Sequence, residues 1–172
     1  MKTISIIASP RKEGNCITAA KQITKNTDNT TYFVDDMDIS PCQACDKCGP
    51  GLDCAIKDDF LKIYDEIAEA DALIFASPIY FGETSAQAKI FMDRFYSIVR
   101  NPDKKLDSKK TIFITAYAGP QGAFTDYTVA KSKTFESIGC KVEACIDMGN
   151  SNPLAKADGS DELAKKLDEI TL

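Results

Sequence analysis

Four cysteines lie within thirteen residues of this chain, spaced Cys42-x2-Cys45-x2-Cys48-x5-Cys54. Cysteine thiolates are the soft ligands that hold iron-sulfur clusters, and three thiolates at intervals of three with a fourth slightly displaced can wrap one 4Fe-4S centre. Structural zinc usually takes two ligand pairs separated by a longer finger, whereas these cysteines are bunched and the sequence contains no His. The spacing therefore favours a 4Fe-4S cluster, with zinc as the first alternative.

The same cysteines could also form disulfides or remain as vacant thiols. Disulfides form in oxidising compartments, but the apolar run in residues 1–8 is too short for a signal peptide and soon meets Pro10 and Arg11. We therefore expect a cytoplasmic protein with reduced thiols. Three more cysteines lie outside the spacing and are expected to be buried as small hydrophobic residues: Cys16, Cys140 and Cys145.

Length and charge limit the classes of protein to which the chain can belong. Its 172 residues suit a single domain, residues 1–172, in which the cysteines form an insertion at about 40–57. The net charge is -5 and no basic stripe is present, so a nucleic-acid partner is not expected. No apolar stretch reaches the length of a membrane span, so we expect no membrane partner either.

Strand-like and helix-like segments alternate along the chain and must position the cysteines and the loops. Short apolar runs predict five strands, at residues 3–8, 31–34, 72–76, 112–114 and 142–146. Helical spacing predicts five helices: one through Ile17, Ala20 and Ile23; one capped by Asp58, through Phe60, Ile63, Tyr64 and Ile67; residues 85–99, through Phe91, Phe95 and Ile98; one through Tyr127, Ala130 and Thr134 that ends near Gly139; and one through Leu163, Leu167 and Ile170. Residues 149–160, rich in Gly, Pro and Asn, are predicted to form a loop.

This alternation predicts an α/β fold. Parallel strands joined by helices need right-handed crossovers, and five such units make an open, doubly wound sheet rather than a barrel. We expect a flavodoxin-like three-layer sandwich with a five-stranded parallel sheet in the order 2-1-3-4-5. The chain then changes direction between strands one and three, so the loops after strands one, three and four should meet at one crevice.

The loop after the first strand, residues 9–16, carries Ser9, Arg11, Gly14 and Asn15 into the start of a helix. Free N–H groups and the positive end of a helix attract anions there. Neither the P-loop pattern nor Gly-x-Gly-x-x-Gly is present, so a lone monophosphate fits better than a nucleoside triphosphate. The alternative is that this loop only makes a turn and caps a helix.

Two further loops should face the same crevice. The loop after the third strand combines exposed backbone with the rings of Tyr80 and Phe81, and the loop after the fourth strand carries Tyr117 and Gly119. On its own, an aromatic pair beside Pro and Gly is more often ordinary turn packing. A phosphate site, an aromatic wall and a glycine-bearing cover together predict a pocket for a phosphorylated flavin.

Several short segments follow one another in a recognisable order. They are Ser9-Pro10-Arg11 with Gly14-Asn15, the four spaced cysteines, Ser77 through Gly82, Ser85-Ala86, and Lys89 with Asp93-Arg94. In this order they resemble the iron-sulfur flavoproteins, which belong to the wider NADPH-dependent FMN reductase family of flavodoxin-fold proteins. The resemblance covers roughly residues 3–95 and thins to general topology beyond them.

The resemblance implies a set of site residues. The residues that it implies for the phosphate of FMN are Ser9, Arg11, Asn15 and Cys16. Those that it implies for the isoalloxazine ring are Pro78, Ile79, Tyr80, Phe81 and Gly82. It implies that the pocket is completed by Tyr117 and Gly119. The resemblance also makes Cys42, Cys45, Cys48 and Cys54 the ligands of a 4Fe-4S cluster. Where this chain has Cys16 the family commonly has Ser or Thr, so a hydroxyl contact to the phosphate would be lost and the backbone N–H would remain.

The resemblance further implies a function. The protein would be an oxidoreductase that passes electrons from ferredoxin or NAD(P)H, through the cluster and FMN, to a small-molecule acceptor, as a homodimer or homotetramer. No catalytic side chain is assigned, because the three loops contain no His and no paired carboxylates. Because the cysteine insertion follows an edge strand, we expect the cluster to serve the FMN of a neighbouring subunit. The competing hypotheses are an NAD(P)H-dependent FMN/quinone reductase or flavodoxin-like carrier without a cluster, and a regulatory module in which the cysteines bind zinc.

Overall fold

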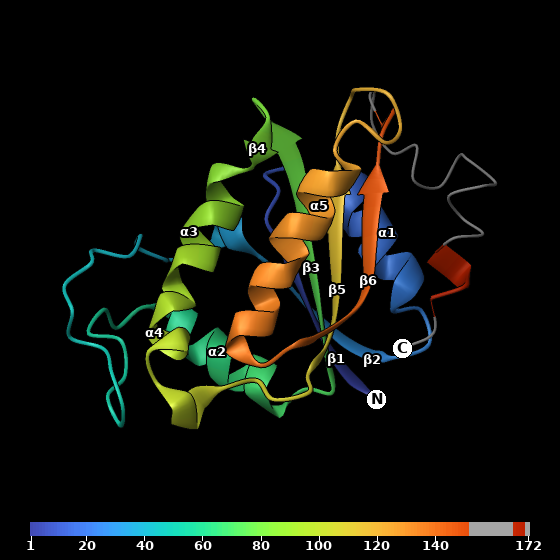
Figure 1. Ribbon diagram of the computed structural model, residues 1–172. Coiled ribbons are helices and arrows are strands. Elements are labelled where there is room, and N and C mark those ends of the chain that lie inside the picture. Colours follow the sequence, from blue (N-terminus) through green and yellow to red (C-terminus); the bar gives the residue numbers. More distant parts are fainter. Residues whose placement is uncertain (152–166, 171–172) are drawn as a thin grey trace.

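The computed structural model describes residues 1–151 and 167–170. Its centre is a sheet of parallel strands, shown in Figure 1. In spatial order they are β2 (Asp28–Phe33), β1 (Lys2–Ile7), β3 (Ala72–Tyr80), β5 (Lys110–Ala116) and β6 (Lys141–Met148). Counted along the chain without the short β4, this is the predicted order 2-1-3-4-5, so the flavodoxin-like α/β architecture is confirmed.

Helices cover both faces of this sheet, as Figure 1 shows. One face packs against α1 (Asn15–Ile23), and the other packs against α2 (Asp59–Glu69), α3 (Ala86–Arg94), α4 (Tyr96–Val99) and α5 (Thr125–Ser132). Alternate side chains of a strand face opposite sides, so Phe75 joins the core under α2 and α3 while Ile74 joins the core under α1. Eight successive residues of β3 are buried, which explains why its sequence shows no polar alternation.

Local side chains fix where several helices begin and end. The Asp58 carboxylate accepts the N–H of Phe60 at 3.2 Å, which confirms the predicted cap of α2, and Ser85 caps α3 in the same way. After α5 the chain continues as a tighter 3-10 turn, η3 (Lys133–Ile138), and stops at Gly139. Gly139 has a φ of 94°, a left-handed conformation that glycine adopts without steric cost.

Some elements differ from the sequence prediction. Residues 85–99 form two helices rather than one, because at Phe95 the N–H bonds to the carbonyl of Met92, three residues back. β2 begins earlier than predicted, and its predicted last residue, Val34, belongs to the 3-10 turn η1 (Val34–Asp36). The two-residue strand β4 (Glu83–Thr84), antiparallel to the end of β3, was not predicted because two residues are too few to show a period.

Part of the predicted C-terminal region cannot be compared with the structure. Leu167 and Ile170 of the predicted last helix are described, whereas Leu163 and residues 152–160 of the predicted loop lie outside the described residues. None of the helices that the structure describes is both long enough and apolar enough to span a membrane.

The cysteine insertion lies outside the sheet. Residues 37–57 follow η1 and run beside α3 and α4 as the cyan loop of Figure 1. All of these residues are described, and they form no helix or strand apart from one bridge between Gly49 and Leu52. A short 3-10 turn, η2 (Pro102–Lys104), follows α4 and supplies some of the contacts to this loop.

Candidate cofactor sites

The loops after β1, β3 and β5 meet at the carboxyl end of the sheet and enclose a cavity of about 260 Å³. In Figure 1 the carboxyl ends of the strands lie at the top, near β4. The lining residues are Ser9, Arg11, Gly14, Asn15, Cys16, Pro78, Ile79, Tyr80, Ala116, Tyr117, Ala118 and Ser151. The three predicted loops therefore face one cavity, as the strand order requires.

Most of the residues predicted to contact the flavin lie in this lining, but Phe81, Gly82 and Gly119 do not. Phe81 and Gly82 form the tip of the β3–β4 hairpin, where both have a positive φ and the Phe81 ring is fully exposed. The Gly119 carbonyl accepts the N–H of Asn150 at 2.7 Å, so its backbone joins two loops instead.

Four lining residues had no predicted contact with the cofactor: Gly14, Ala116, Ala118 and Ser151. Gly14 lies within the predicted phosphate loop, where a Cβ would come within 3.1 Å of the Cβ of Arg11. Ser151 reaches the cavity because its N–H and its hydroxyl both donate to the carbonyl of Tyr117, at 3.0 and 2.8 Å. Because Ser151 and Tyr117 are far apart in sequence, no local sequence pattern could have identified Ser151 as a residue of this cavity.

The first wall of the cavity is the loop between β1 and α1. Ser9 is buried, and its hydroxyl accepts the N–H of Arg11 at 3.2 Å, which turns the loop back on itself. Gly14 occupies the N-cap position of α1 and has no side chain that could cap the helix, and the first turn of α1 has no acidic residue. The N–H groups at the start of a helix attract anions, and the cationic Arg11 beside them makes this end of α1 suitable for a phosphate.

Cys16 lines the same wall, but its thiol is packed into the core under α1. Burial raises the pKa of this thiol to about 12, so it is neutral at physiological pH. Cys140 is buried as predicted, whereas the prediction for Cys145 is wrong because that residue is exposed. It lies on the edge strand β6, and its thiol donates to the Ser132 hydroxyl of α5 at 2.9 Å.

Tyr117 fixes the third wall of the cavity. Its hydroxyl donates to the carboxylate of Asp147 at 2.5 Å and accepts the N–H of Gly122 at 3.1 Å. The ring of Phe124 packs against it edge to face, with 4.9 Å between the centroids. Burial and the bond to Asp147 raise the pKa of Tyr117, so the hydroxyl keeps its proton and holds the following loop in place.

The β3–β4 hairpin beside the cavity is tied to α5. The Tyr127 hydroxyl accepts the N–H of Thr84 at 2.7 Å and donates to the carboxylate of Glu83 at 2.6 Å. Lys131 pairs with the same carboxylate at 3.2 Å. The bonds from Tyr127 and then from Lys131 hold the pKa of Glu83 below its usual value. These contacts fix the hairpin against α5, and the hairpin places Tyr80 in the cavity lining.

A second hollow lies in the cysteine insertion and is lined by all four spaced cysteines. Cys42 and Cys45 are exposed, Cys48 is partly buried and Cys54 is buried, and each is a free thiol. None of its described lining residues belongs to the lining of the first cavity. The structure therefore keeps the two groups of predicted site residues apart.

Side chains that follow α3 in sequence tie the insertion to the fold. Three of these contacts join Arg100 to Asp46 at 2.7 Å, the Asn101 amide to the Leu52 carbonyl at 3.3 Å, and Lys104 to Asp53 at 2.8 Å. The exposed ion pairs among them contribute little energy singly, so each of them stabilises the loop only weakly.

The donor set of this hollow could hold a group larger than one metal ion. Within the described residues, no three His, Cys, Asp or Glu side chains gather closely enough to hold a metal ion. A 4Fe-4S cluster takes one thiolate on each iron, so its ligands stand around a larger body than the ligands of zinc do. The four free thiols are the donors that such a group takes, while the hollow that they line measures only about 20 Å³.

Comparison with known proteins agrees with this arrangement. The sequence pattern of the NADPH-dependent FMN reductase family matches residues 1–134. An iron-sulfur flavoprotein of Methanosarcina thermophila is 38% identical over 99 residues, which cover 55% of this chain and 52% of that protein. The chain spans about half the length of the curated relatives that it matches first.

Two solved structures share the fold. The Trp repressor binding protein of Bacillus subtilis superposes with a TM-score of 0.75 at 19% identity, over 99% of each chain. A flavodoxin of Streptococcus pneumoniae superposes with a TM-score of 0.62 at 15% identity, over 99% of this chain and 94% of the flavodoxin. At these identities the likeness shows the flavodoxin-like fold alone.

Proposed function

Because the chain belongs to the NADPH-dependent FMN reductase family, we propose that it is an oxidoreductase that binds FMN and carries a 4Fe-4S cluster. It passes electrons between ferredoxin or NAD(P)H and a small-molecule acceptor. The observation that carries the proposal is that three loops distant in sequence enclose one cavity at the switch point of the sheet, while four thiols surround a second hollow.

In this proposal the phosphate of FMN binds at the start of α1. The donors there are the N–H groups at the start of the helix, the Ser9 hydroxyl and the Arg11 guanidinium. The amide of Asn15 donates to the Ser151 carbonyl and so joins the phosphate loop to the third wall. Cys16 contributes its backbone N–H only, because its thiol is packed in the core.

The isoalloxazine ring takes its contacts from Pro78, Ile79 and Tyr80, with Tyr117 from the third wall. Backbone and aromatic groups of this kind bind a flat ring and exclude water from it. Phe81, Gly82 and Gly119 do not line the cavity, and their contacts with the cofactor stay predictions.

The cysteines of the insertion hold the cluster as thiolates. When bound, FMN supplies two-electron chemistry and the cluster supplies one-electron chemistry, so together they convert between the two modes. The described lining of the flavin cavity contains no carboxylate and no His. In the proposal, the side chains of this described lining bind and orient the cofactors, and the cofactors carry the redox chemistry.

We also propose that the protein assembles as a homodimer or homotetramer in which the cluster serves the FMN of a neighbouring subunit. The separate linings of the two sites support this arrangement. A monomer that transfers electrons between its own two cofactors at full rate would contradict it.

A cluster-free flavoprotein is the second candidate, and the exposure of Cys42 and Cys45 favours it. Such a flavoprotein could be a reductase or a carrier, and the two are distinguished by whether the protein oxidises NADH or NADPH over many turnovers. An NAD(P)H-dependent FMN/quinone reductase oxidises NADH or NADPH over many cycles, whereas a flavodoxin-like carrier reduces partner proteins without doing so.

The test is the visible spectrum of protein purified without oxygen, combined with assays for iron, acid-labile sulfide and FMN. We expect flavin bands with a broad shoulder and about four irons per FMN. A protein that binds flavin but no iron, even after anaerobic reconstitution, would exclude the cluster and support the cluster-free flavoprotein. A colourless protein that retains zinc would contradict both candidates.

A further inference from the structure

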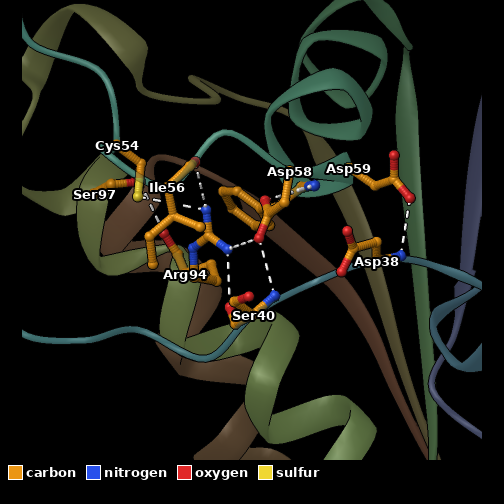
Figure 2. Close-up of polar contacts among 9 residues, drawn as sticks. Asp38, Ser40, Cys54, Ile56, Asp58, Asp59, Arg94 and Ser97 are labelled. Atoms are coloured by element: carbon orange, nitrogen blue, oxygen red, sulfur yellow. Dashed lines mark hydrogen bonds and ion pairs between the residues drawn. The ribbon is translucent and has the colours of Figure 1, made fainter.

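The guanidinium of Arg94 is buried at the edge of the cysteine hollow. Arg94 is the last residue of α3, is 1% exposed and lines the hollow together with the four cysteines. Figure 2 shows its side chain surrounded by groups from the cysteine insertion. Its Nε is the only buried side-chain nitrogen or oxygen without a partner in the part of the chain that the structure describes. Burying a charge in this way is costly, so its contacts need an explanation.

Arg94 joins the two ends of the cysteine insertion. Its Nη1 donates to the carbonyl of Ser40, before the first cysteine, at 2.9 Å, and to the carboxylate of Asp58, after the last cysteine, at 2.5 Å. Its Nη2 donates to the carbonyl of Ile56 at 3.2 Å and to the sulfur of Cys54 at 3.4 Å. A guanidinium offers several donors in a rigid plane, so one side chain can hold all four groups, which a lysine ammonium could not do in this geometry.

Asp58 completes the arrangement by balancing the charge. Its side chain is 6% exposed, and it also accepts the N–H of Ser40 at 2.9 Å. Burial alone would raise the pKa of this carboxyl, but the bonds from Arg94 and Ser40 hold the pKa below its usual value. The ring of Phe60, centred 4.9 Å from the guanidinium carbon, packs against Arg94.

We propose that Arg94 is a positioning residue of the iron-sulfur site, which fixes Cys54 and, by donating to its sulfur, raises the reduction potential of the cluster. The inference rests on the proposed function, since it concerns the cluster assigned above. Hydrogen bonds to the ligand sulfurs and the local charge are among the factors that set such potentials. A donor to the sulfur and a nearby positive charge both stabilise the reduced, more negative cluster. Asp58 acts in the opposite direction because its charge is negative.

The opposite charges give a test that depends on sign. We would measure the cluster potential by redox titration with detection by electron paramagnetic resonance, on the full chain with its cofactors. Arg94→Met should lower the potential, and Asp58→Asn should raise it. The double variant Arg94→Met/Asp58→Asn keeps the buried charge balanced but lacks the donor to sulfur, so its potential should lie below that of the unaltered protein. A purely structural ion pair would not move the two single variants in opposite directions.

Arg100→Met is the matched control. Arg100 also reaches the insertion from the helical region, but its partner Asp46 is exposed and neither residue bonds to a cysteine in the described contacts. Water screens this charge, so the shift should be smaller than for Arg94→Met. FMN content, measured in every variant, checks that the sheet and its cavity are intact.

The outcomes separate this inference from the proposed function. The role of Arg94 would be overturned if the reduction potential shifted in the same direction in both single variants, or if the double variant kept the potential of the unaltered protein. Neither result would contradict the presence of the cluster. Should Arg94→Met fail to fold, the other two variants still test the proposal: the potential should rise in Asp58→Asn and fall in the double variant. An unaltered protein that binds FMN and no iron would overturn the cluster, and this inference with it.

Discussion

The flavin cavity and the cysteine hollow lie in the same chain but are held in different ways. The walls of the cavity leave the ends of β1, β3 and β5, and strand pairing fixes where those ends lie. The hollow lies in a loop without strands or helices among its described residues, and side chains such as Arg94, Arg100 and Lys104 hold it. The main chain thus builds one site, and side chains from distant positions build the other.

The two sites should therefore respond differently to the loss of a ligand. Ser9 and Tyr117 are buried and hydrogen-bonded to neighbouring groups of the protein, whereas Cys42 and Cys45 are exposed. A metal group that binds such a loop can supply part of its order. It follows that a change in the hollow should leave FMN binding in the cavity intact, and that a change in the cavity should leave iron binding in the hollow intact.

The largest effect is expected for Cys45→Ala. Cys45 is exposed, so the truncation removes a cluster ligand with little change in packing. Iron should fall from about four atoms per chain to nearly none after anaerobic reconstitution, with FMN content unchanged. Cys145→Ala is the matched control, because Cys145 is also exposed but lies on β6, and it should keep its iron. Iron retained by Cys45→Ala, or FMN lost with the iron, would show that the two sites are not independent in this way.

Arg11→Met tests the other site. The lost bonds between a charged donor and the phosphate should weaken FMN binding by about 1.5–3 kcal/mol, roughly ten- to a hundredfold in Kd, measured by titrating apoprotein with FMN. Iron per chain should not change. Lys12→Met is the control, because Lys12 carries the same charge one residue away but pairs with Asp36 outside the cavity lining. Equal weakening in both variants would mean that only net charge matters and that Arg11 has no specific contact.

Tyr127→Phe should have a smaller effect on the same cavity. It removes the hydroxyl that ties Thr84 and Glu83 of the hairpin to α5. FMN should bind about 0.5–1.5 kcal/mol more weakly, roughly two- to tenfold, because the wall that carries Tyr80 becomes less fixed. Tyr32→Phe also removes a hydroxyl bond to a carboxylate, but on β2, and should leave Kd unchanged. Unchanged Kd in both variants would show that α5 does not support the cavity.

The smallest signal is expected from Cys16. With its pKa raised to about 12 by burial, about one thiol in ten thousand is ionised at pH 8, and this fraction rises tenfold with each pH unit above it. In cluster-free protein treated with iodoacetamide at pH 8, mass spectrometry should find the insertion cysteines labelled and Cys16 unlabelled. Labelling of Cys16 as fast as Cys42 would show that the phosphate loop is as open as the insertion.

Much of the sheet could be predicted from the sequence because its signals are local. The unbroken apolar run of β3 and the capping carboxylate of Asp58 each depend on neighbours in sequence, and both predictions are confirmed. The strand order then brought the loop after β1, with Ser9 and Arg11, and Tyr117 to one cavity. The phosphate and ring contacts assigned within that cavity stay predictions.

What the sequence did not reveal depends on contacts between distant residues. Ser151 enters the cavity through a bond to Tyr117, and Phe81 lies at the tip of the β3–β4 hairpin, outside the cavity lining. Arg94 was recognised only as part of a motif, because its partners Ser40 and Asp58 lie more than thirty residues away. Its signal in the sequence was an arginine at the end of a helix with an apolar face, which is also common on protein surfaces.

Both cofactors can be located in one experiment, since the chain is proposed to hold FMN at the sheet edge and a 4Fe-4S cluster in the separate insertion. The protein would be crystallised without oxygen and its diffraction measured at the iron absorption edge. We predict an anomalous iron peak ringed by Cys42, Cys45, Cys48 and Cys54, and flavin density against Pro78 and Tyr80 with its phosphate at the start of α1. A zinc peak or disulfides at the cysteines, or a flavin seated elsewhere, would contradict the proposal.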